Sequence, residues 1–381
     1  MKKIIIITAA VLGSAQSAYA VDLKAGDWTV SVGGIINAYY TQISCTGDSV
    51  GGLALGGQAL GCGGKSNRTT IGNGLLPSGL ITSVKSRQGD YDVAGTIGIM
   101  TATASDTAIG NNSNVDVRQG FFSFGNDQMG TIKLGRDYGL FGANAILGDM
   151  TLIGSGAPVR ATQSNRVTLG HIGAGYSYLG TYGQVAYSSP SMSGVKFDVA
   201  LVSPVTNGPL GSGYDSGSSP QVQGRISYSV DGLKLWVGAK GQKFEGNTTT
   251  KPSFTMRGIE AGASYSAGAL GLLANVQSGN GIGILSDGDE GDTKTNNYFA
   301  QATFKLSEKV KLGMNYGMSK NRDNTLATGG LESNSNVTGG VYFAITPSIT
   351  LSAEIGQTRS KGFDGRSAQM NGGSFGGIFF F

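Results

Sequence analysis

The sequence predicts an all-β fold, a closed antiparallel transmembrane β-barrel of about sixteen strands. Three features of the 381-residue chain indicate this fold: apolar and polar residues alternate along many short segments, tight turns alternate with long polar loops, and the chain ends on three phenylalanines. Beyond the first twenty residues no window holds eighteen consecutive apolar residues, so membrane-spanning helices are not predicted.

Residues 1–20 have the pattern of a secretory signal peptide. Lys2 and Lys3 form a basic start, an apolar run follows, and Ala18 and Ala20 give the small-x-small pattern of a cleavage site. The apolar run is shorter than the roughly 20 residues that a spanning helix requires. We therefore expect an exported protein in which residues 21–381 form a single barrel domain.

The composition argues against several classes of function. The chain has 28 Lys and Arg against 24 Asp and Glu, and two of the basic residues belong to the predicted signal. A nearly neutral exported chain gives no reason to expect nucleic acid as a partner. The only histidine is His171, which excludes metal sites built from several histidines, and we predict no catalysis, metal or cofactor.

Cys45 and Cys62 are the only two cysteines and lie in one Gly-rich stretch. A close, even pair in an exported chain favours a disulfide. In the chain-entropy model, closing a loop of this size contributes about 3 kcal/mol. We expect a disulfide between them, with two free thiols as the alternative.

Alternation with a period of two is the strongest signal in the chain. In the segment 310–318, Leu312 and Met314 share an apolar face, whereas Lys311 lies on the opposite face. Lys196 and Lys234 occupy the polar face of their segments in the same way. The clearest segments of this kind are 195–201, 233–238, 298–305, 310–318 and 349–355.

The connections between these segments alternate in length. Short turns are predicted at 87–90, 125–130, 191–194, 231–232, 268–269, 307–309 and 347–348, all rich in turn-forming residues. Long polar loops separate them, for example 206–220, 286–294 and 324–333. Strands placed on either side of these connections number about sixteen, which suits one closed sheet.

A barrel explains where the apolar faces go. In lipid every backbone N–H and C=O must be paired, which a closed barrel achieves while turning its apolar side outward. The first barrel strand, 28–42, is expected to pair with the last. Phe375, Phe379 and Phe381 share one parity and are expected to face lipid, and the glycine-rich interior is expected to be open.

Four stretches resemble the Gram-negative general porins: the opening strand around Gly33 and Gly34, the run RQGFFSF at 118–124, GRDYG at 135–139, and the terminal Phe381. The resemblance implies a sixteen-stranded trimeric channel of the outer membrane. It also implies small hydrophilic solutes, membrane lipids, lipopolysaccharide and, through Phe381, the barrel assembly machinery as partners.

In porins of this kind the third long loop folds into the barrel and narrows it. The corresponding loop here runs from Asp137 to about residue 166 and has a helix-compatible run at 140–147. Asp149 falls at the position of the family's constriction aspartate, whereas the family's second loop acid is Ile153 here, which favours anions slightly. The resemblance and strand parity assign the constriction to Asp137, Asp149, Arg118, Arg68, Lys133 and Arg136.

Alternatives remain open at this point. Arg118 and Arg68 can be solvated wall residues that pair with neighbours. The protein can be a substrate-specific channel of the same fold or a structural or adhesive barrel. An outer-membrane hydrolase using His171 is the least favoured. The acidic run 287–292 lacks the spacing of a calcium loop and suits a hydrated surface loop.

Overall fold

A computed structural model describes residues 20–56, 66–103, 114–156, 168–206, 214–246, 252–323 and 330–381. The predicted signal peptide lies outside them except for its last residue, so it stays a prediction. Within this part of the chain, no helix has the length and apolar character needed to cross a membrane.

Nineteen strands form one sheet. They are β1 Val21–Ala25, β2 Trp28–Gly47, β3 Asn67–Gly72, β4 Ser78–Gln88, β5 Tyr91–Ala102, β6 Asn114–Asn126, β7 Gly130–Tyr138, β8 Thr181–Ser188, β9 Val195–Val202, β10 Tyr214–Ser216, β11 Gln221–Val230, β12 Leu233–Gly246, β13 Phe254–Ala267, β14 Leu270–Asn280, β15 Lys294–Lys305, β16 Val310–Asn321, β17 Leu331–Ala344, β18 Ile349–Gly362 and β19 Ser367–Phe380.

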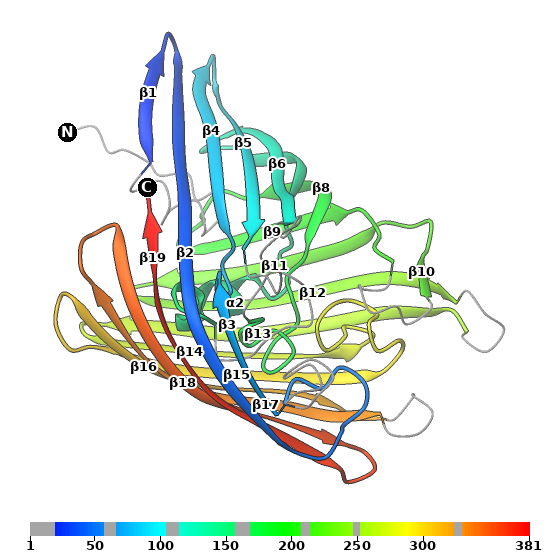
Figure 1. Cartoon of the computed structure of the whole chain (residues 1–381). Coiled ribbons are helices and arrows are strands. Elements are labelled where there is room, and N and C mark those ends of the chain that lie inside the picture. Colours follow the sequence, from blue (N-terminus) through cyan, green and yellow to red (C-terminus); the bar gives the residue numbers. More distant parts are fainter. Residues whose placement is uncertain are drawn as a thin grey trace.

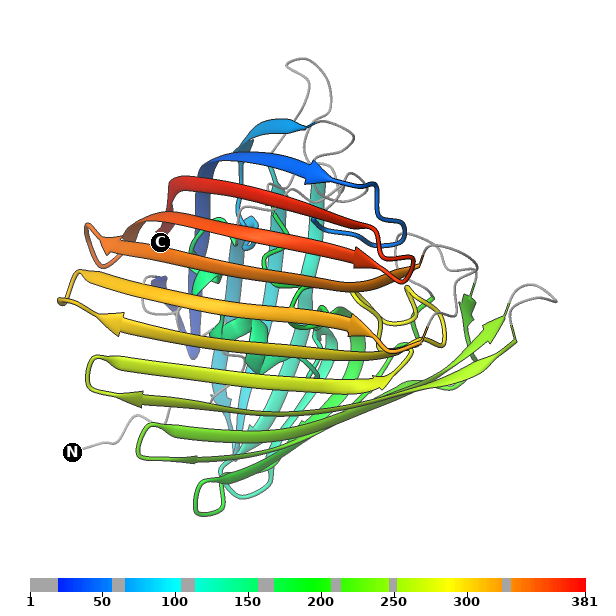
Figure 2. The ribbon, with the colours of Figure 1, turned by 90° about the horizontal axis from the view of Figure 1, so that it is seen from below.

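The nineteen strands make a closed antiparallel barrel of sixteen strand positions, which confirms the predicted fold. Three positions are each occupied by two strands in line. β3 and β4 both pair with the same side of β2, β10 and β11 both pair with β12, and β1 continues the line of β19 along β2. Figures 1 and 2 show the long strands lying side by side around the wall.

The first and last strands close the barrel as predicted. β19 pairs with β2 from Ala368↔Gly47 to Phe380↔Ile35, and the two strands lie side by side in Figure 1. Beyond the strand, Phe381 exchanges two backbone hydrogen bonds with Gly34, of 2.8 and 3.1 Å. The terminal residue is therefore paired, which explains why an aromatic end does not fray.

The barrel presents apolar side chains outward and polar ones inward. Ile355, Met314 and Phe375 are among the exposed large apolar residues, whereas Asn315 and Thr358 on alternate positions are buried. Phe375 and Phe379 are exposed as predicted. All seven predicted short turns join consecutive strands at one end of the barrel, the short-turn end.

Some boundaries differ from the prediction. β2 extends to Gly47 instead of residue 42, because its far half has a partner in β19. Among the described residues, the strand after β7 begins only at Thr181, so the third loop runs between residues 139 and 180 instead of 137 and 166. β10 lies inside the predicted loop 206–220, and β17 already begins at Leu331.

The interior is not open throughout, contrary to expectation. Three segments carry apolar residues that pack inside the barrel: 48–56, the described parts of 139–180, and 281–293. Leu55, Ile146, Tyr176 and Ile284 belong to one cluster, and each is at least 95% buried. Burial of this apolar surface removes it from water and offsets the entropy of ordering the segments.

Candidate pore constriction

The third loop contains two short helices, α2 Ala143–Gly148 and the 3₁₀ helix η1 Met150–Ile153. This confirms the helix-compatible run predicted around 140–147. Gly142 precedes α2 with φ of 81°, a left-handed conformation that glycine adopts without strain. Both views place α2 inside the ring of strands (Figures 1 and 2), where its first four residues are buried.

Inward-facing side chains of the wall bind the backbone of this loop. Glu260 accepts from Gly142 N at 2.9 Å, and Gln301 accepts from Met150 N at 2.7 Å. Glu354 Oε2 accepts from Gly156 N at 3.2 Å. Because buried backbone donors need acceptors, these contacts fix the loop against β13, β15 and β18.

Asp149 is the centre of the loop's anchorage. Its Oδ1 accepts from Thr151 N at 2.9 Å, Thr151 Oγ1 at 2.8 Å and Asn315 Nδ2 at 3.1 Å. Its Oδ2 lies 3.0 Å from His171 Nδ1 and accepts from Tyr176 OH at 2.7 Å. The side chains of Asp149 and His171 are both 0% exposed.

The electrostatics of this cluster follow from burial and partners. Burial alone would raise the pKa of Asp149, but His171 and the hydrogen bonds from Tyr176 and Thr151 outweigh it and lower that pKa below its usual 3.8. Burial, followed by the charge of Asp149, raises the pKa of Tyr176 well above its usual value. Asp149 therefore holds the loop, and its charge does not face the water-filled lumen.

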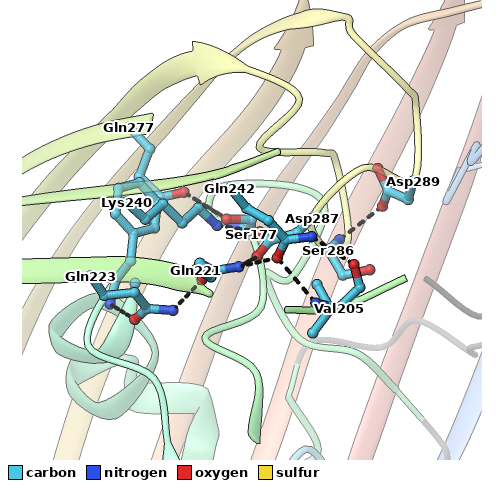
Figure 3. A network of polar contacts seen from close by, with 12 residues as sticks. Ser177, Val205, Gln221, Gln223, Lys240, Gln242, Gln277, Ser286, Asp287 and Asp289 are labelled. Atoms are coloured by element: carbon cyan, nitrogen blue, oxygen red, sulfur yellow. Dashed lines mark hydrogen bonds and ion pairs between the residues drawn. The ribbon is translucent and has the colours of Figure 1, made fainter. Parts of the chain in front are cut away.

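A second inward segment, 281–293, is held by a polar network (Figure 3). Asp287 forms a buried ion pair with Lys240 and accepts from Gln221 Nε2 at 2.9 Å. Asp289 accepts from the backbone N–H groups of residues 284, 285 and 286 at 3.0, 2.7 and 2.8 Å, which closes the turn. The predicted hydrated surface loop is thus a packed segment instead.

The segment 48–56 is the third one inside the barrel. Asn334 of β17 accepts from Leu55 N at 3.1 Å and donates to the carbonyl of Leu53 at 3.0 Å. Ser360 of β18 accepts from Gly56 N at 2.6 Å. The three segments therefore pack inside the barrel, and cavities remain next to α2.

Two cavities lie beside α2 among the described residues, of about 390 and 450 Å³. Turn residues Ser191 and Gly194 line the first cavity, so it lies toward the short-turn end. The charged residues of the first cavity are Lys133, Lys196, Arg225, Lys234, Asp137 and Asp198, and those of the second are Lys234, Lys311 and the covered Asp149.

Asp137 and Asp198, which line the first cavity, form ion pairs with basic side chains, whereas some of the basic side chains have no acidic partner. Asp137 pairs with Lys133, and Asp198 pairs with Arg225 at 2.8 Å. Within the described residues, Lys234 and Lys311 have no carboxylate within ion-pair distance. Lys311 instead lies 5.0 Å from the ring centre of Tyr342, a cation–π contact. The wall of the cavities is therefore positively charged.

The structure brings together only part of the predicted constriction. Lys133 and Asp137 face the first cavity, with Gln119 Nε2 donating to Asp137 at 3.0 Å. Lys133 also lies 5.3 Å from the ring centre of Phe121. Asp149, expected beside them, is sealed under the loop because five hydrogen bonds satisfy its carboxylate there.

The three arginines of the predicted constriction do not line either cavity. Arg118 sits where the pairing of β5 with β6 slips by one residue, and its Nε bonds Asp116 at 3.0 Å. Arg68 is half-buried on the inward face of β3. Arg136 is exposed on the outward face of β7, opposite in parity to Lys133, and donates to Thr181 Oγ1 at 2.9 Å.

The constriction prediction missed the basic residues Lys196, Arg225, Lys234 and Lys311. The sequence pattern indicated three of them, because Lys196, Lys234 and Lys311 lie on the polar face of strands whose other face is apolar. Their proximity to α2 could not be predicted, because it depends on how the third loop packs. Cys45 is disulfide-bonded, while Cys62 lies outside the described residues, so their pairing stays a prediction.

A closed sixteen-stranded barrel with an apolar exterior, a polar wall and an inward third loop defines an outer-membrane channel. The family model for the Gram-negative porin matches residues 7–362. The chain belongs to the Gram-negative porin family, a family of channels and not enzymes, and its place is the outer membrane.

Solved structures share the fold at low sequence identity. The outer membrane channel DcaP of Acinetobacter baumannii is 15% identical with a TM-score of 0.70, over 94% of this chain and 99% of that one. The anion-selective porin from Comamonas acidovorans is 16% identical with a TM-score of 0.64, over 93% and 100%. Salmonella typhi OmpF is 14% identical with a TM-score of 0.61, over 95% and 100%. Among curated proteins none matches the sequence.

Proposed function

We propose that this porin passes small hydrophilic solutes by diffusion through the two cavities beside α2, and that it prefers anions. The observation that carries the proposal is the positive wall described above, with Lys234 and Lys311 lacking acidic partners. Charged side chains at a narrow point of a channel select the sign of the ion that passes. The solved porin from Comamonas acidovorans, which is described as anion-selective, supports the same reading.

A homotrimer is part of this proposal. One of the structurally similar proteins, OmpT of Vibrio cholerae, is described in a trimer form. Outer-membrane lipids, lipopolysaccharide and, through Phe381, the assembly machinery are the proposed partners. Current steps in groups of three would support the trimer, and independent single steps would oppose it.

A substrate-specific channel is the second candidate. The observation that favours it is the occupied lumen, since three inward segments leave only limited space beside α2. Such a channel would show a current that one class of solute blocks in a saturable way. A general channel would show currents that scale with solute size and charge alone.

The reversal potential of the purified protein in a planar bilayer with a potassium chloride gradient tests the ion preference. An anion-preferring pore gives a reversal potential displaced toward that of chloride. Lys311→Gln should reduce this displacement, while Lys309→Gln in an exposed short turn serves as the matched control. A reversal potential displaced toward that of potassium would refute the proposal.

A further inference from the structure

We propose that Lys234 and Asn144 form a binding site for the oxyanion group of a passing solute, a carboxylate or a phosphate. The site lies where the helix α2 meets the wall strand β12, and it rests on the proposed function because it assumes that solutes pass beside α2. It adds a solute class and two specificity-determining residues to that function.

The position of the pair makes it a point of passage. Only Asn144, Leu147 and Lys234 line both cavities among the described residues. A solute that moves from one cavity to the other therefore contacts these side chains. Leu147 offers an apolar surface, whereas the other two offer hydrogen-bond donors.

The polar groups of the pair are unevenly matched. Lys234 Nζ donates to Asn144 Oδ1 at 2.7 Å, and a lysine ammonium has three donors to place. Asn144 is only 7% exposed, and its Nδ2 has no hydrogen-bond partner within the described residues. Since lysine can only donate, the oxygen of Asn144 must face it, so the amide nitrogen faces elsewhere. The site thus has spare donors and lacks an acceptor.

The surroundings add positive charge and no free acid. Arg225 lies close to Lys234, but its guanidinium is already bound to Asp198 Oδ2 at 2.8 and 3.2 Å. Lys196 lies 3.8 Å from the same aspartate. Hydroxyl groups that line the cavities can donate further hydrogen bonds, those of Ser227, Ser229, Ser264 and Ser266.

These features match the chemistry of an oxyanion. A carboxylate or phosphate group carries several acceptor lone pairs and forms charge-assisted hydrogen bonds that are stronger than a bond to a neutral amide. The oxyanion can therefore replace Asn144 Oδ1 as the acceptor for Lys234, and a rotation of the released Asn144 amide then turns Nδ2 toward the oxyanion. A neutral residue at position 144 suits this exchange, because an aspartate there would form a permanent ion pair with Lys234.

The test is the chloride current of the purified full-length protein in planar bilayers, measured with rising concentrations of benzoate or of glycerol 3-phosphate, and with glycerol as the neutral control. We expect at least one anion to reduce the current in a saturable way, and glycerol to leave it unchanged at equal concentration. Comparing the two anions separates carboxylate from phosphate recognition.

Four variants decide the role of the pair. Lys234→Gln and Asn144→Asp should each raise the half-blocking concentration at least tenfold, whereas Lys309→Gln should leave it unchanged. Heat-modifiable migration on gels checks that each variant is folded, and Lys234→Arg, which keeps the charge, should retain block. An unchanged half-blocking concentration in folded Lys234→Gln, or no block by either anion in the wild type, overturns the inference. The reversal potential in potassium chloride alone tests the anion preference separately, so a retained preference without block refutes this site only.

Discussion

Asp149→Asn is predicted to loosen the third loop without reversing ion selectivity. The substitution keeps an oxygen that can accept from Thr151 and Asn315 but places an NH₂ group where Oδ2 receives His171 and Tyr176. The side chain is 0% exposed and both of its oxygens accept hydrogen bonds, so its charge acts mainly on the anchorage of the loop.

The magnitude follows from the two lost bonds to the carboxylate. Hydrogen bonds to charged groups contribute about 1.5–3 kcal/mol each, which gives a loss of about 3–6 kcal/mol in loop anchorage. Because about 1.4 kcal/mol corresponds to a tenfold change in an equilibrium constant, displaced loop conformations should become at least about a hundredfold more populated.

Single-channel recording is the assay. The variant should show frequent excursions to higher conductance, while its reversal potential in a salt gradient keeps the sign of the wild type. Lys311→Gln, which removes a charge of the positive wall, is the comparison and should shift the reversal potential without such excursions. If Asp149→Asn shifts the reversal potential as much as Lys311→Gln and leaves the current steps quiet, the anchoring role is wrong.

The lowered pKa of Asp149 predicts the pH below which the third loop loses its anchorage. A carboxylate whose pKa is lowered in the folded state contributes stability above its unfolded pKa of about 3.9 and loses it as the pH falls through the folded value. The wild-type current should therefore stay quiet from pH 7 to about pH 4 and become noisy only under stronger acid. Noise that begins near pH 6 would contradict this assignment.

Three further predictions concern other parts of the barrel. Lys240→Met leaves Asp287 buried and unpaired, which should cost about 3–5 kcal/mol and speed hydrogen exchange in 281–293, whereas adding Asp287→Leu should restore much of the protection. Burial, then the charge of Asp289, raises the pKa of Glu290 from 4.5 to about 8, so this segment should be most protected below pH 4.5 and lose protection as the pH rises through about 8. Glu290→Gln should flatten the pH dependence of hydrogen-exchange protection in 281–293, after correction for intrinsic exchange rates. An unchanged pH dependence in this variant would reject the role of Glu290. Deleting residues 379–381 removes the pairing of Phe381 and should lower the heat-modifiable, folded fraction on gels, while equal folding would show that the aromatic end does not close the barrel.

The strands could be predicted from the sequence because each reports its own environment. Leu312 and Met314 face lipid and Lys311 faces the lumen, so apolar and polar residues alternate with a period of two along the strand. The turns at the short-turn end of the barrel also depend on local sequence alone. Asp231 and Gly232, for example, both adopt a positive φ in a two-residue hairpin.

The filled interior could not be predicted in this way. Phe244 and Met256 lie on inward positions where the alternation predicts polar residues, and they are fully buried because Ile282 of an inward segment packs on them. The bond between Asp149 and Asn315 joins residues 166 positions apart. Such contacts depend on loop packing, which no local pattern encodes.

The difference between local pattern and loop packing also explains which predicted constriction residues line the cavities. Lys133, predicted from strand parity, and Asp137, predicted from the resemblance, both line a cavity, whereas Arg136 was assigned from its motif although its parity points outward. Lys234 had the correct parity but was overlooked, because its significance comes from Asn144 on a helix that packs against it. Family position predicted which loop lies inside, and only the structure showed which charges remain exposed beside it.

The most direct test of the central claim, that solutes pass beside α2 along a positive wall, is reaction of an introduced cysteine with a negatively charged methanethiosulfonate reagent during current recording. Ser227 lines the first cavity, whereas Thr338 also lies on an inward position but is 0% exposed. The account predicts that the reagent reduces the current of Ser227→Cys, and does so faster than a positively charged reagent of similar size, while Thr338→Cys is unaffected. Current through Ser227→Cys that neither reagent changes, or equal block of both variants, would contradict it.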